Sequence, residues 1–147
     1  MEGWGIPDEP ISARDAELKN PLALAFIGDT VWDLLVRRRL LATSARVNAL
    51  HRQAVGLVNA GAQAKALCRL EPLLTGTESD IVRRGVNAHS RHVTPRNQDP
   101  VDYRRATGLE AMLGWLYLSG QWARVSQLFD AAYPPGTDID PPARRTD

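Results

Sequence analysis

Cysteine is nearly absent from the sequence, and its rarity excludes the disulfide-stapled class of small secreted domains. The single cysteine, Cys68, cannot form an internal disulfide, so we expect a reducing, cytoplasmic compartment. The first residues lack the basic flank and apolar core of a signal peptide. The most apolar stretch, residues 22–41, contains two aspartates and a run of three arginines, and we therefore expect no membrane-spanning segment.

Several familiar catalytic motifs are also missing. The sequence has no cysteine pair and no His-Glu-x-x-His pattern for zinc, no glycine-rich loop ending in Lys-Ser or Lys-Thr for nucleotide phosphates, and no Gly-x-Ser-x-Gly nucleophile. It has no His-Asp dipeptide, which argues against an HD-type phosphohydrolase. The net charge of +1 indicates no particular partner, but residues 83–105 carry six arginines against two aspartates. Any binding of an anionic partner is therefore expected in that stretch.

The fold class is indicated by the absence of strand patterns. No segment alternates polar and apolar residues convincingly, so we expect an all-α fold, a helical bundle around two buried apolar helices. A chain of 147 residues can bury roughly two-thirds of its unfolded surface as one domain. We predict an N-terminal arm over residues 1–19, with a short helix from Ser12 to Lys19, one domain over residues 20–133, and a disordered tail over residues 134–147.

Caps, breakers and apolar spacing predict the remaining helices. Asn20 and Pro21 suit a cap and a first helical position for a central helix that ends near Leu41. Apolar residues fall on every face of this helix, so we expect it to be buried. Further helices are predicted over residues 48–70, 77–82, 106–118 and 122–133, with an irregular polar loop over residues 83–100.

Two acids inside the apolar helices require an explanation, because an unpaired buried carboxylate is costly. Asp33 has Arg37 one turn later, and we predict that ion pair, but Asp29 has no basic residue three or four positions away. Glu110 repeats the pattern in the second apolar helix. Glycines beside both acids indicate a close helix crossing, so we expect the two carboxylates to face each other and share a proton or a hard cation such as Mg²⁺.

An ordinary ion pair is the alternative for Glu110. Arg104 and Arg105 lie near the start of its own helix and are candidate partners. Because structural ion pairs imitate functional carboxylates, composition alone leaves the ion pair and the metal site about equally supported.

The basic stretch supplies candidate contacts for phosphate oxygens. Arginine forks and neighbouring polar side chains suit phosphate binding, although a solvated loop is the simpler interpretation of any charge run. Together with the two carboxylates, the stretch favours metal-assisted cleavage of a phosphodiester. The candidate RNA-binding residues are Arg83, Arg84, Asn87, His89, Arg91, Arg96 and Arg104.

Three motifs, in order along the chain, resemble the ribonuclease III family. The segment Ala25-Phe26-Ile27-Gly28-Asp29 resembles the signature helix Glu-Phe-Leu-Gly-Asp, and residues 107–118 resemble the second motif, Asp-x-x-Glu-Ala-Leu-x-Gly-Ala-x-Tyr-Leu. Residues 84–90 and 94–97 are similar to segments of the Mini-ribonuclease III subfamily, which has the catalytic domain without the double-stranded-RNA-binding domain. The resemblance covers roughly residues 20–133.

This resemblance implies an all-α, homodimeric, Mg²⁺-dependent endoribonuclease that cuts double-stranded RNA and matures large-subunit ribosomal RNA. Asp29 matches the catalytic, metal-binding aspartate and Glu110 the metal-binding glutamate, while Phe26 matches an aromatic at the dimer interface. Ala25 and Thr107 stand where the full-length enzyme has two further carboxylates. Two other functions stay open: a catalytically lapsed homologue that binds structured RNA, and a helical scaffold whose acids form ordinary ion pairs.

Overall fold

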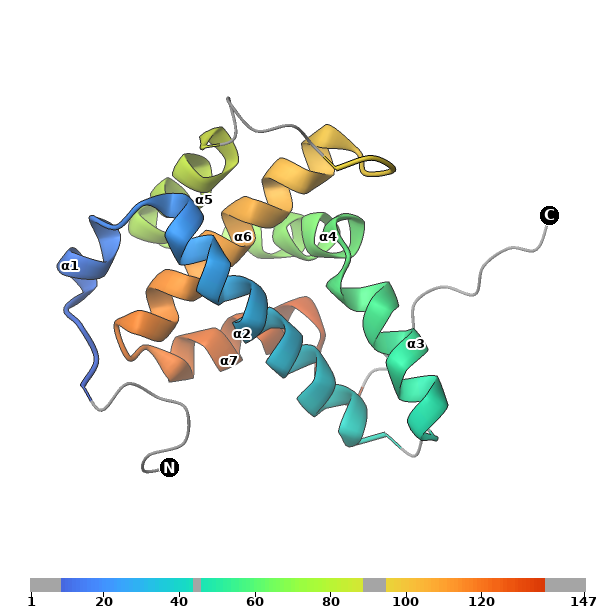
Figure 1. Ribbon diagram of the computed structural model, residues 1–147. Coiled ribbons are helices and arrows are strands. Elements are labelled where there is room, and N and C mark those ends of the chain that lie inside the picture. The colour runs from blue at the N-terminus through green and yellow to red at the C-terminus, as the bar shows by residue number, and fades with distance from the viewer. Residues whose placement is uncertain (1–8, 44–45, 89–94, 137–147) are drawn as a thin grey trace.

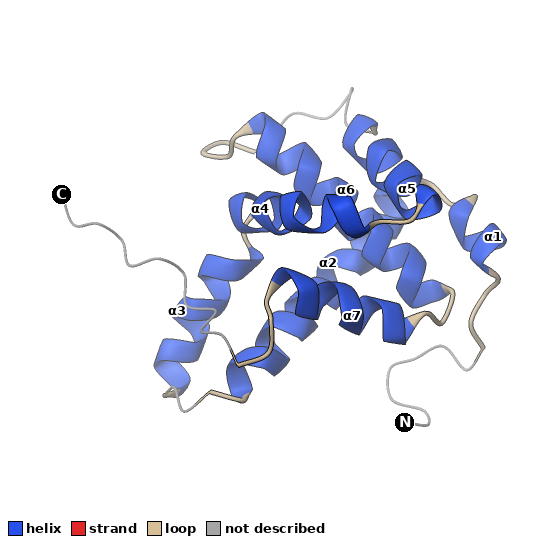
Figure 2. Cartoon of the chain, turned by 180° about the vertical axis from the view of Figure 1, so that it is seen from behind, coloured by secondary structure: helices blue, strands red, loops and turns tan. Residues whose placement is uncertain are grey.

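The structure, a computed structural model, describes residues 9–43, 46–88 and 95–136 (Figure 1). These residues form helices joined by short connections, with no strand among them, and this confirms the predicted all-α fold. Figure 2 shows the same helices from behind. In chain order they are α1 (Ala13–Glu17), α2 (Pro21–Leu41), α3 (Val47–Val58), α4 (Ala60–Leu70), the 3₁₀ turn η1 (Glu71–Leu73), α5 (Gly76–Asn87), α6 (Pro100–Leu118) and α7 (Trp122–Ala132).

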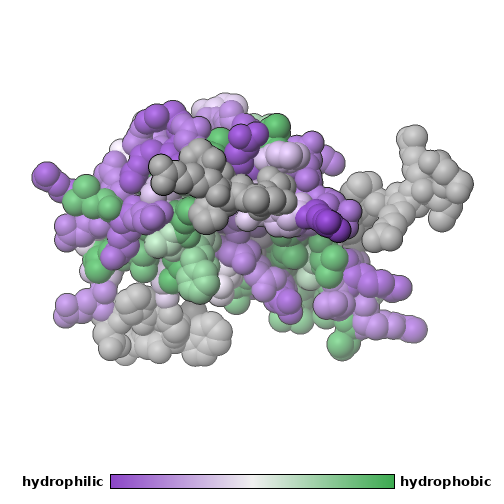
Figure 3. Space-filling view, turned by 45° about the horizontal axis from the view of Figure 1, so that its top comes forward, coloured by the Kyte–Doolittle hydropathy of each residue, from purple (hydrophilic) through white to green (hydrophobic). Residues whose placement is uncertain are grey.

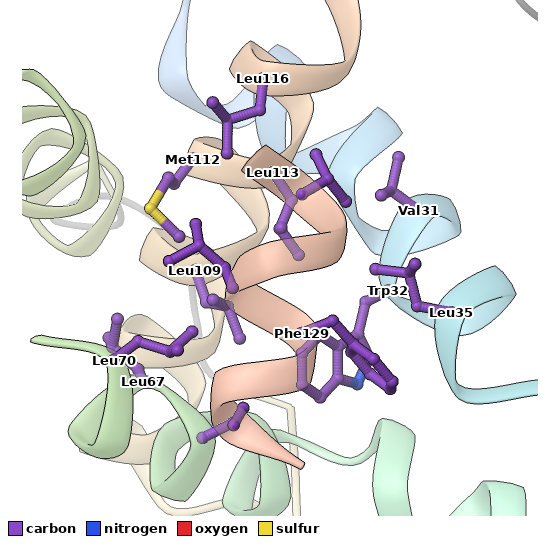
Figure 4. Close-up of a cluster of buried hydrophobic side chains, with 14 of the residues drawn as sticks. Val31, Trp32, Leu35, Leu67, Leu70, Leu109, Met112, Leu113, Leu116 and Phe129 are labelled. Atoms are coloured by element: carbon purple, nitrogen blue, oxygen red, sulfur yellow. The ribbon is translucent and has the colours of Figure 1, made fainter. Parts of the chain in front are cut away.

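The core lies around the crossing of α2 and α6, which make the most extensive contact between any two elements (Figure 1). Helices α4 and α5 pack against α6, and the buried face of α7 also meets α4. Figure 4 shows the apolar side chains that converge there from α2, α4, α6 and α7. Trp32 packs edge-on against Phe129 with ring centroids 5.5 Å apart, and its Nε1 donates to the Leu57 carbonyl at 2.9 Å. The two apolar helices predicted from the sequence are therefore the centre of the bundle.

The expectation that α2 is buried on all sides is wrong. Its ends are as predicted, with the Asn20 side chain accepting a hydrogen bond from the Leu22 amide, and Asp33 pairs with Arg37 at 3.0 Å as expected. However, one face stays open, and the Phe26 side chain on it is 86% exposed. The surface in Figure 3 likewise shows hydrophobic residues among hydrophilic ones. An apolar pattern on every face does not say which face this chain itself covers.

The single helix predicted over residues 48–70 is two helices, α3 and α4, separated at Asn59. Asn59 has an extended backbone, with ψ of 161°, and its side chain caps both helices. Its Nδ2 donates to the carbonyls of Val55 and Gly56, while its Oδ1 accepts from the Ala62 amide at 2.9 Å. Because one side chain makes hydrogen bonds to the free backbone groups of both helix ends, the chain can break sharply at Asn59 at little cost in free energy. The apolar spacing continues through Asn59 and therefore does not reveal the break.

The predicted loop over residues 83–100 is also corrected, because half of its described residues are helical. Helix α5 begins earlier than predicted, at a capping box formed by Thr75 and Glu78, and it continues to Asn87. Helix α6 begins at Pro100, six residues before the predicted start, with the Asp99 side chain accepting from the amides of Val101 and Asp102. The described remainder of the loop is a turn in which Asn97 has a φ of 71°.

The outer helices agree with the sequence. The Ser12 side chain caps α1, and Trp115 Nε1 ties that helix to the core by donating to the Ala13 carbonyl at 2.8 Å. Helix α6 ends at Leu118 with Ser119 as its C-cap, and Gly120 takes a φ of 74° that glycine adopts without strain. Helix α7 lies within the predicted range 122–133 and buries four apolar residues: Val125, Leu128, Phe129 and Ala132. The predicted tail lies almost wholly outside the described residues.

Candidate active site

The candidate site lies at the crossing of α2 and α6, where two glycines bring the helix backbones into contact. A Cβ atom added to Gly28 would lie 1.7 Å from the Glu110 carbonyl oxygen, and one added to Gly114 would lie 2.0 Å from the Leu24 carbonyl oxygen. No side chain fits at either position. This contact places Asp29, the residue after Gly28, beside Glu110, as the positions of the glycines predicted.

A cleft of about 560 Å³ opens at this crossing. Asp29 and Glu110 lie in its wall, together with residues from the α3–α4 junction, from the turn before α6 and from the first half of α6. Ala25 and Thr107, the positions of the two missing carboxylates, also line it. The other lining residues are Leu22, Phe26, Val58, Asn59, Ala60, Gln63, Gln98, Tyr103 and Ala106.

The two acids determine the electrostatics of the cleft. Burial, a hydrogen bond with Asp29 and the negative charge of Asp29 together raise the pKa of Glu110 to about 9, and contact with the Gln63 amide acts in the opposite direction. Without a cation, Glu110 is therefore protonated at neutral pH. The close approach of two carboxyl groups has this effect because both cannot ionise at low cost.

The ion-pair alternative for Glu110 is not what the structure contains. Arg105 forms its ion pair with Glu71 instead, and its pKa is raised by that hydrogen bond. Arg104 is exposed, and its Nε donates to the Pro100 carbonyl at 3.2 Å. The charged neighbour of Glu110 that raises its pKa is thus an acid rather than a base.

These residues fit a divalent cation. Two facing carboxyl groups that retain a proton offer oxygen ligands whose charge an ion would neutralise. In the part of the chain that the structure describes, no group of three or more His, Cys, Asp and Glu side chains gathers at one point. The protein would therefore supply few ligands, and Mg²⁺ tolerates this because it commonly keeps several of its waters.

None of the predicted RNA-binding residues that the structure describes lines the cleft. Arg83 pairs with Asp80, and Arg84 Nη1 donates to the Glu17 carbonyl at 2.9 Å, which ties α5 to α1. Asn87, Arg96 and Arg104 are exposed, whereas His89 and Arg91 lie outside the described residues.

Sequence reasoning missed several polar residues in the wall of the cleft. Gln63 is the most deeply placed of them, at 3% exposure, while Asn59, Gln98 and Tyr103 are nearer to the surface. A polar residue among the apolar positions of residues 60–70 was the one signal available for Gln63. The other three carry no such signal, because polar residues near helix ends are common.

Comparison with known proteins assigns the fold to one class of nuclease. The model of the ribonuclease III domain matches residues 22–121, and a protein of Fusobacterium nucleatum with a crystal structure shares the fold with a TM-score of 0.70. That neighbour is 26% identical, and the match covers 77% of this chain and 90% of the other.

Two curated relatives narrow the assignment. A Mini-ribonuclease 3 of Symbiobacterium thermophilum is 49% identical over 113 residues, which are 76% of this chain and 86% of the relative. A Mini-ribonuclease 3 of Brevibacillus brevis is 43% identical over 121 residues, covering 82% and 90%. The chain belongs to the Mini-ribonuclease 3 branch of the ribonuclease III family. It is an endoribonuclease of a family that acts on double-stranded RNA and depends on metal ions.

No helix among the described residues is both long enough and apolar enough to cross a membrane.

Proposed function

We propose that this chain is a Mg²⁺-dependent endoribonuclease that hydrolyses phosphodiesters of double-stranded RNA at a site formed by Asp29 and Glu110. The observation that carries the proposal is the pair of facing carboxyl groups at the glycine-tight crossing, with the pKa of Glu110 raised to about 9. A cleft that leaves the pair open on one side gives a phosphate access to it.

The residues of the chain have distinct roles in this mechanism. Asp29 and Glu110 would hold the ion, while the backbone contacts at Gly28 and Gly114 keep the two carboxyl groups at a constant separation. Bound Mg²⁺ would supply Lewis-acid chemistry, making water more acidic and stabilising negative charge on phosphate oxygens. Ala25 and Thr107 leave the rest of the cleft without further charge, so the RNA phosphate can enter without repulsion from additional acids.

RNA binding would use the exposed basic side chains around the end of α5 and the start of α6. Arg96 and Arg104 are exposed and make no ion pair among the described residues, so their charges are available to phosphates. We also propose RNA contacts for Arg83, Arg84, Asn87, His89 and Arg91. Arg84 contributes less in this geometry, because its guanidinium already holds α1. Recognition of shape and 2′-hydroxyls predicts little sequence preference.

The open apolar face of α2 supports a homodimer. Phe26 is 86% exposed and Leu34 is 41% exposed on the same helix, which is unusual for large apolar side chains in a chain that acts alone. A two-fold axis there would present two sites to the two strands of a duplex. We expect sedimentation to give a dimer mass at micromolar concentration and Phe26→Glu to give a monomer; a monomeric parent chain would contradict the proposal.

The substrate we propose is a precursor of large-subunit ribosomal RNA, processed in the cytoplasm. The support is the Mini-ribonuclease 3 relationship over most of the chain.

Incubation of labelled duplex RNA with the protein, with and without Mg²⁺, tests the central proposal. We expect cleavage only with the ion, and cleavage of single-stranded RNA of the same sequence should be much slower. A gel shift without cleavage in either condition would instead favour the RNA-binding homologue.

A further inference from the structure

Gln63 is a buried polar side chain in the wall of the cleft for which the mechanism above has no role. It projects from α4, is 3% exposed and lies beside Glu110. Its Nε2 atom is buried and makes no hydrogen bond of normal geometry to any described residue, although the amide lies close enough to the Glu110 carboxyl group to lower its pKa. A buried amide with poor hydrogen bonding destabilises a folded domain, so its position beside two carboxyl groups calls for a functional reason.

Two neighbouring polar groups of the wall already have partners. The Asn59 amide is occupied at both atoms by the caps of α3 and α4, and Thr107 Oγ1 donates to the Tyr103 carbonyl at 3.0 Å. The Gln63 amide is therefore a donor in the cleft wall whose acceptor there is the Glu110 carboxyl group. Because α4 packs directly against α6, its backbone is held at a constant position relative to Glu110.

We propose that Gln63 is a positioning residue of the cation site: its Nε2 donates a hydrogen bond to the Glu110 carboxylate and orients that group toward the ion it shares with Asp29. This inference rests on the proposed function. A carboxylate that binds an ion through one oxygen has its other oxygen free for a donor, and such supporting bonds commonly fix ligand geometry in metal sites. Gln63 contacts the ligand rather than the ion or the RNA, so it is not a catalytic residue.

Substitution by methionine removes the donor while keeping the size of the side chain. We would measure the melting temperature of Gln63→Met as Mg²⁺ is added without RNA, and the Mg²⁺ concentration that half-saturates cleavage of duplex RNA. Gln53→Met is the matched control, because Gln53 is a half-buried glutamine on α3 that does not line the cleft. If Gln63→Met does not fold, Gln63→Leu replaces it.

We expect Gln63→Met to need about tenfold more Mg²⁺, or more, in both measurements, with cleavage near the parent rate once Mg²⁺ saturates. Its melting temperature without Mg²⁺ should equal or exceed that of the parent chain, since a buried amide with poor hydrogen bonding has been removed. The control should keep the parent's Mg²⁺ dependence.

Three results would overturn the inference. An unchanged Mg²⁺ dependence in Gln63→Met would overturn the inference alone and leave the proposed function intact. A large fall in melting temperature without Mg²⁺, with unchanged Mg²⁺ dependence, would show a structural role instead. If neither the melting temperature of the parent chain nor its cleavage of duplex RNA depended on Mg²⁺, both the inference and the proposed function would be overturned.

Discussion

Glu78 and Glu110 are two acids of the same small domain that lie in opposite electrostatic environments. Glu78 is the more deeply buried, at 2% exposure, whereas Glu110 is half-buried. Burial would raise the pKa of Glu78, but hydrogen bonds from Arg124 and the Thr75 amide, with the charge of Arg124, outweigh it and lower that pKa. At Glu110, burial and the facing Asp29 act in the same direction and raise the pKa to about 9. Burial raises the pKa of both acids, and the partner decides the outcome: a base outweighs burial at Glu78, whereas a second acid adds to it at Glu110.

The geometry of the Glu78 site explains its structural character. Arg124 approaches with two nitrogens, Nε at 2.9 Å and Nη2 at 2.7 Å from the two carboxylate oxygens, and the Thr75 amide donates at 2.8 Å. The acid thereby connects the start of α5 to α7 and is fully satisfied. Glu110 has no basic partner of this kind. A carboxyl group that lies beside a second acid and has no basic partner indicates a cation-binding site.

The largest expected effect is on cleavage, when either acid of the pair loses its charge. Asp29→Asn and Glu110→Gln should each reduce duplex RNA cleavage by a factor of a thousand or more, about 4 kcal/mol of barrier, because each removes an ion ligand. RNA binding, measured by gel shift, should persist. Asp33→Asn is the control on the same helix, since its partner is Arg37 at the surface. Comparable cleavage by either of the first two variants would refute the site.

The next effect is on folding, when the crossing itself is forced apart. Gly28→Ala should lower the free energy of unfolding by about 3 kcal/mol, because the new methyl group would collide with the Glu110 carbonyl, a backbone atom that cannot rotate away. Urea unfolding measures this loss. Gly76→Ala is the matched control, since nothing lies within 4 Å of a Cβ atom there. Equal stability of the two variants would mean that the helices do not touch at Gly28.

A smaller effect is expected at Glu78. Glu78→Gln should lower the free energy of unfolding by about 2 kcal/mol, because it leaves the Arg124 fork poorly paired, while the remaining folded protein should still cleave RNA. Glu71→Gln is the control: its pair with Arg105 is largely exposed and should contribute less than about 1 kcal/mol. If Glu78→Gln lost cleavage but kept stability, the contrast with Glu110 would fail.

The smallest effect is a dependence of stability on pH. Because the pKa of Glu78 is lower in the folded chain than its ordinary value of 4.5, its stabilising contribution is present above that value and is lost as pH falls through the folded pKa. The difference in unfolding free energy between the parent chain and Glu78→Gln should therefore shrink on acidification, as urea titrations at several pH values would show. A difference that stayed constant from neutral to acidic pH would contradict the lowered pKa.

Local signals in the sequence determined most of the helices and the two helices at the centre. Asn20 with Pro21, Ser12, and Ser119 with Gly120 act within a turn of their own positions, so their effects can be read without knowing the fold. The glycines beside Asp29 and Glu110 likewise indicated the crossing, because glycine inside an apolar helix has few other uses.

Tertiary packing decided the rest, because each remaining choice depends on residues far apart in the chain. In the sequence, Arg104 and Arg105 were equal candidates for an ion pair with Glu110. In the structure, η1 lies next to Arg105, which pairs with Glu71, 34 residues away. Helix α5 extends beyond its predicted end because Gly85 packs on Gly108 of α6, a contact that no local sequence pattern predicts. Gln63 became part of the cleft only because α4 lies on α6, and the same packing left Phe26 uncovered. Caps and periodicity act over a few residues, whereas which side chains meet is decided by how whole helices pack.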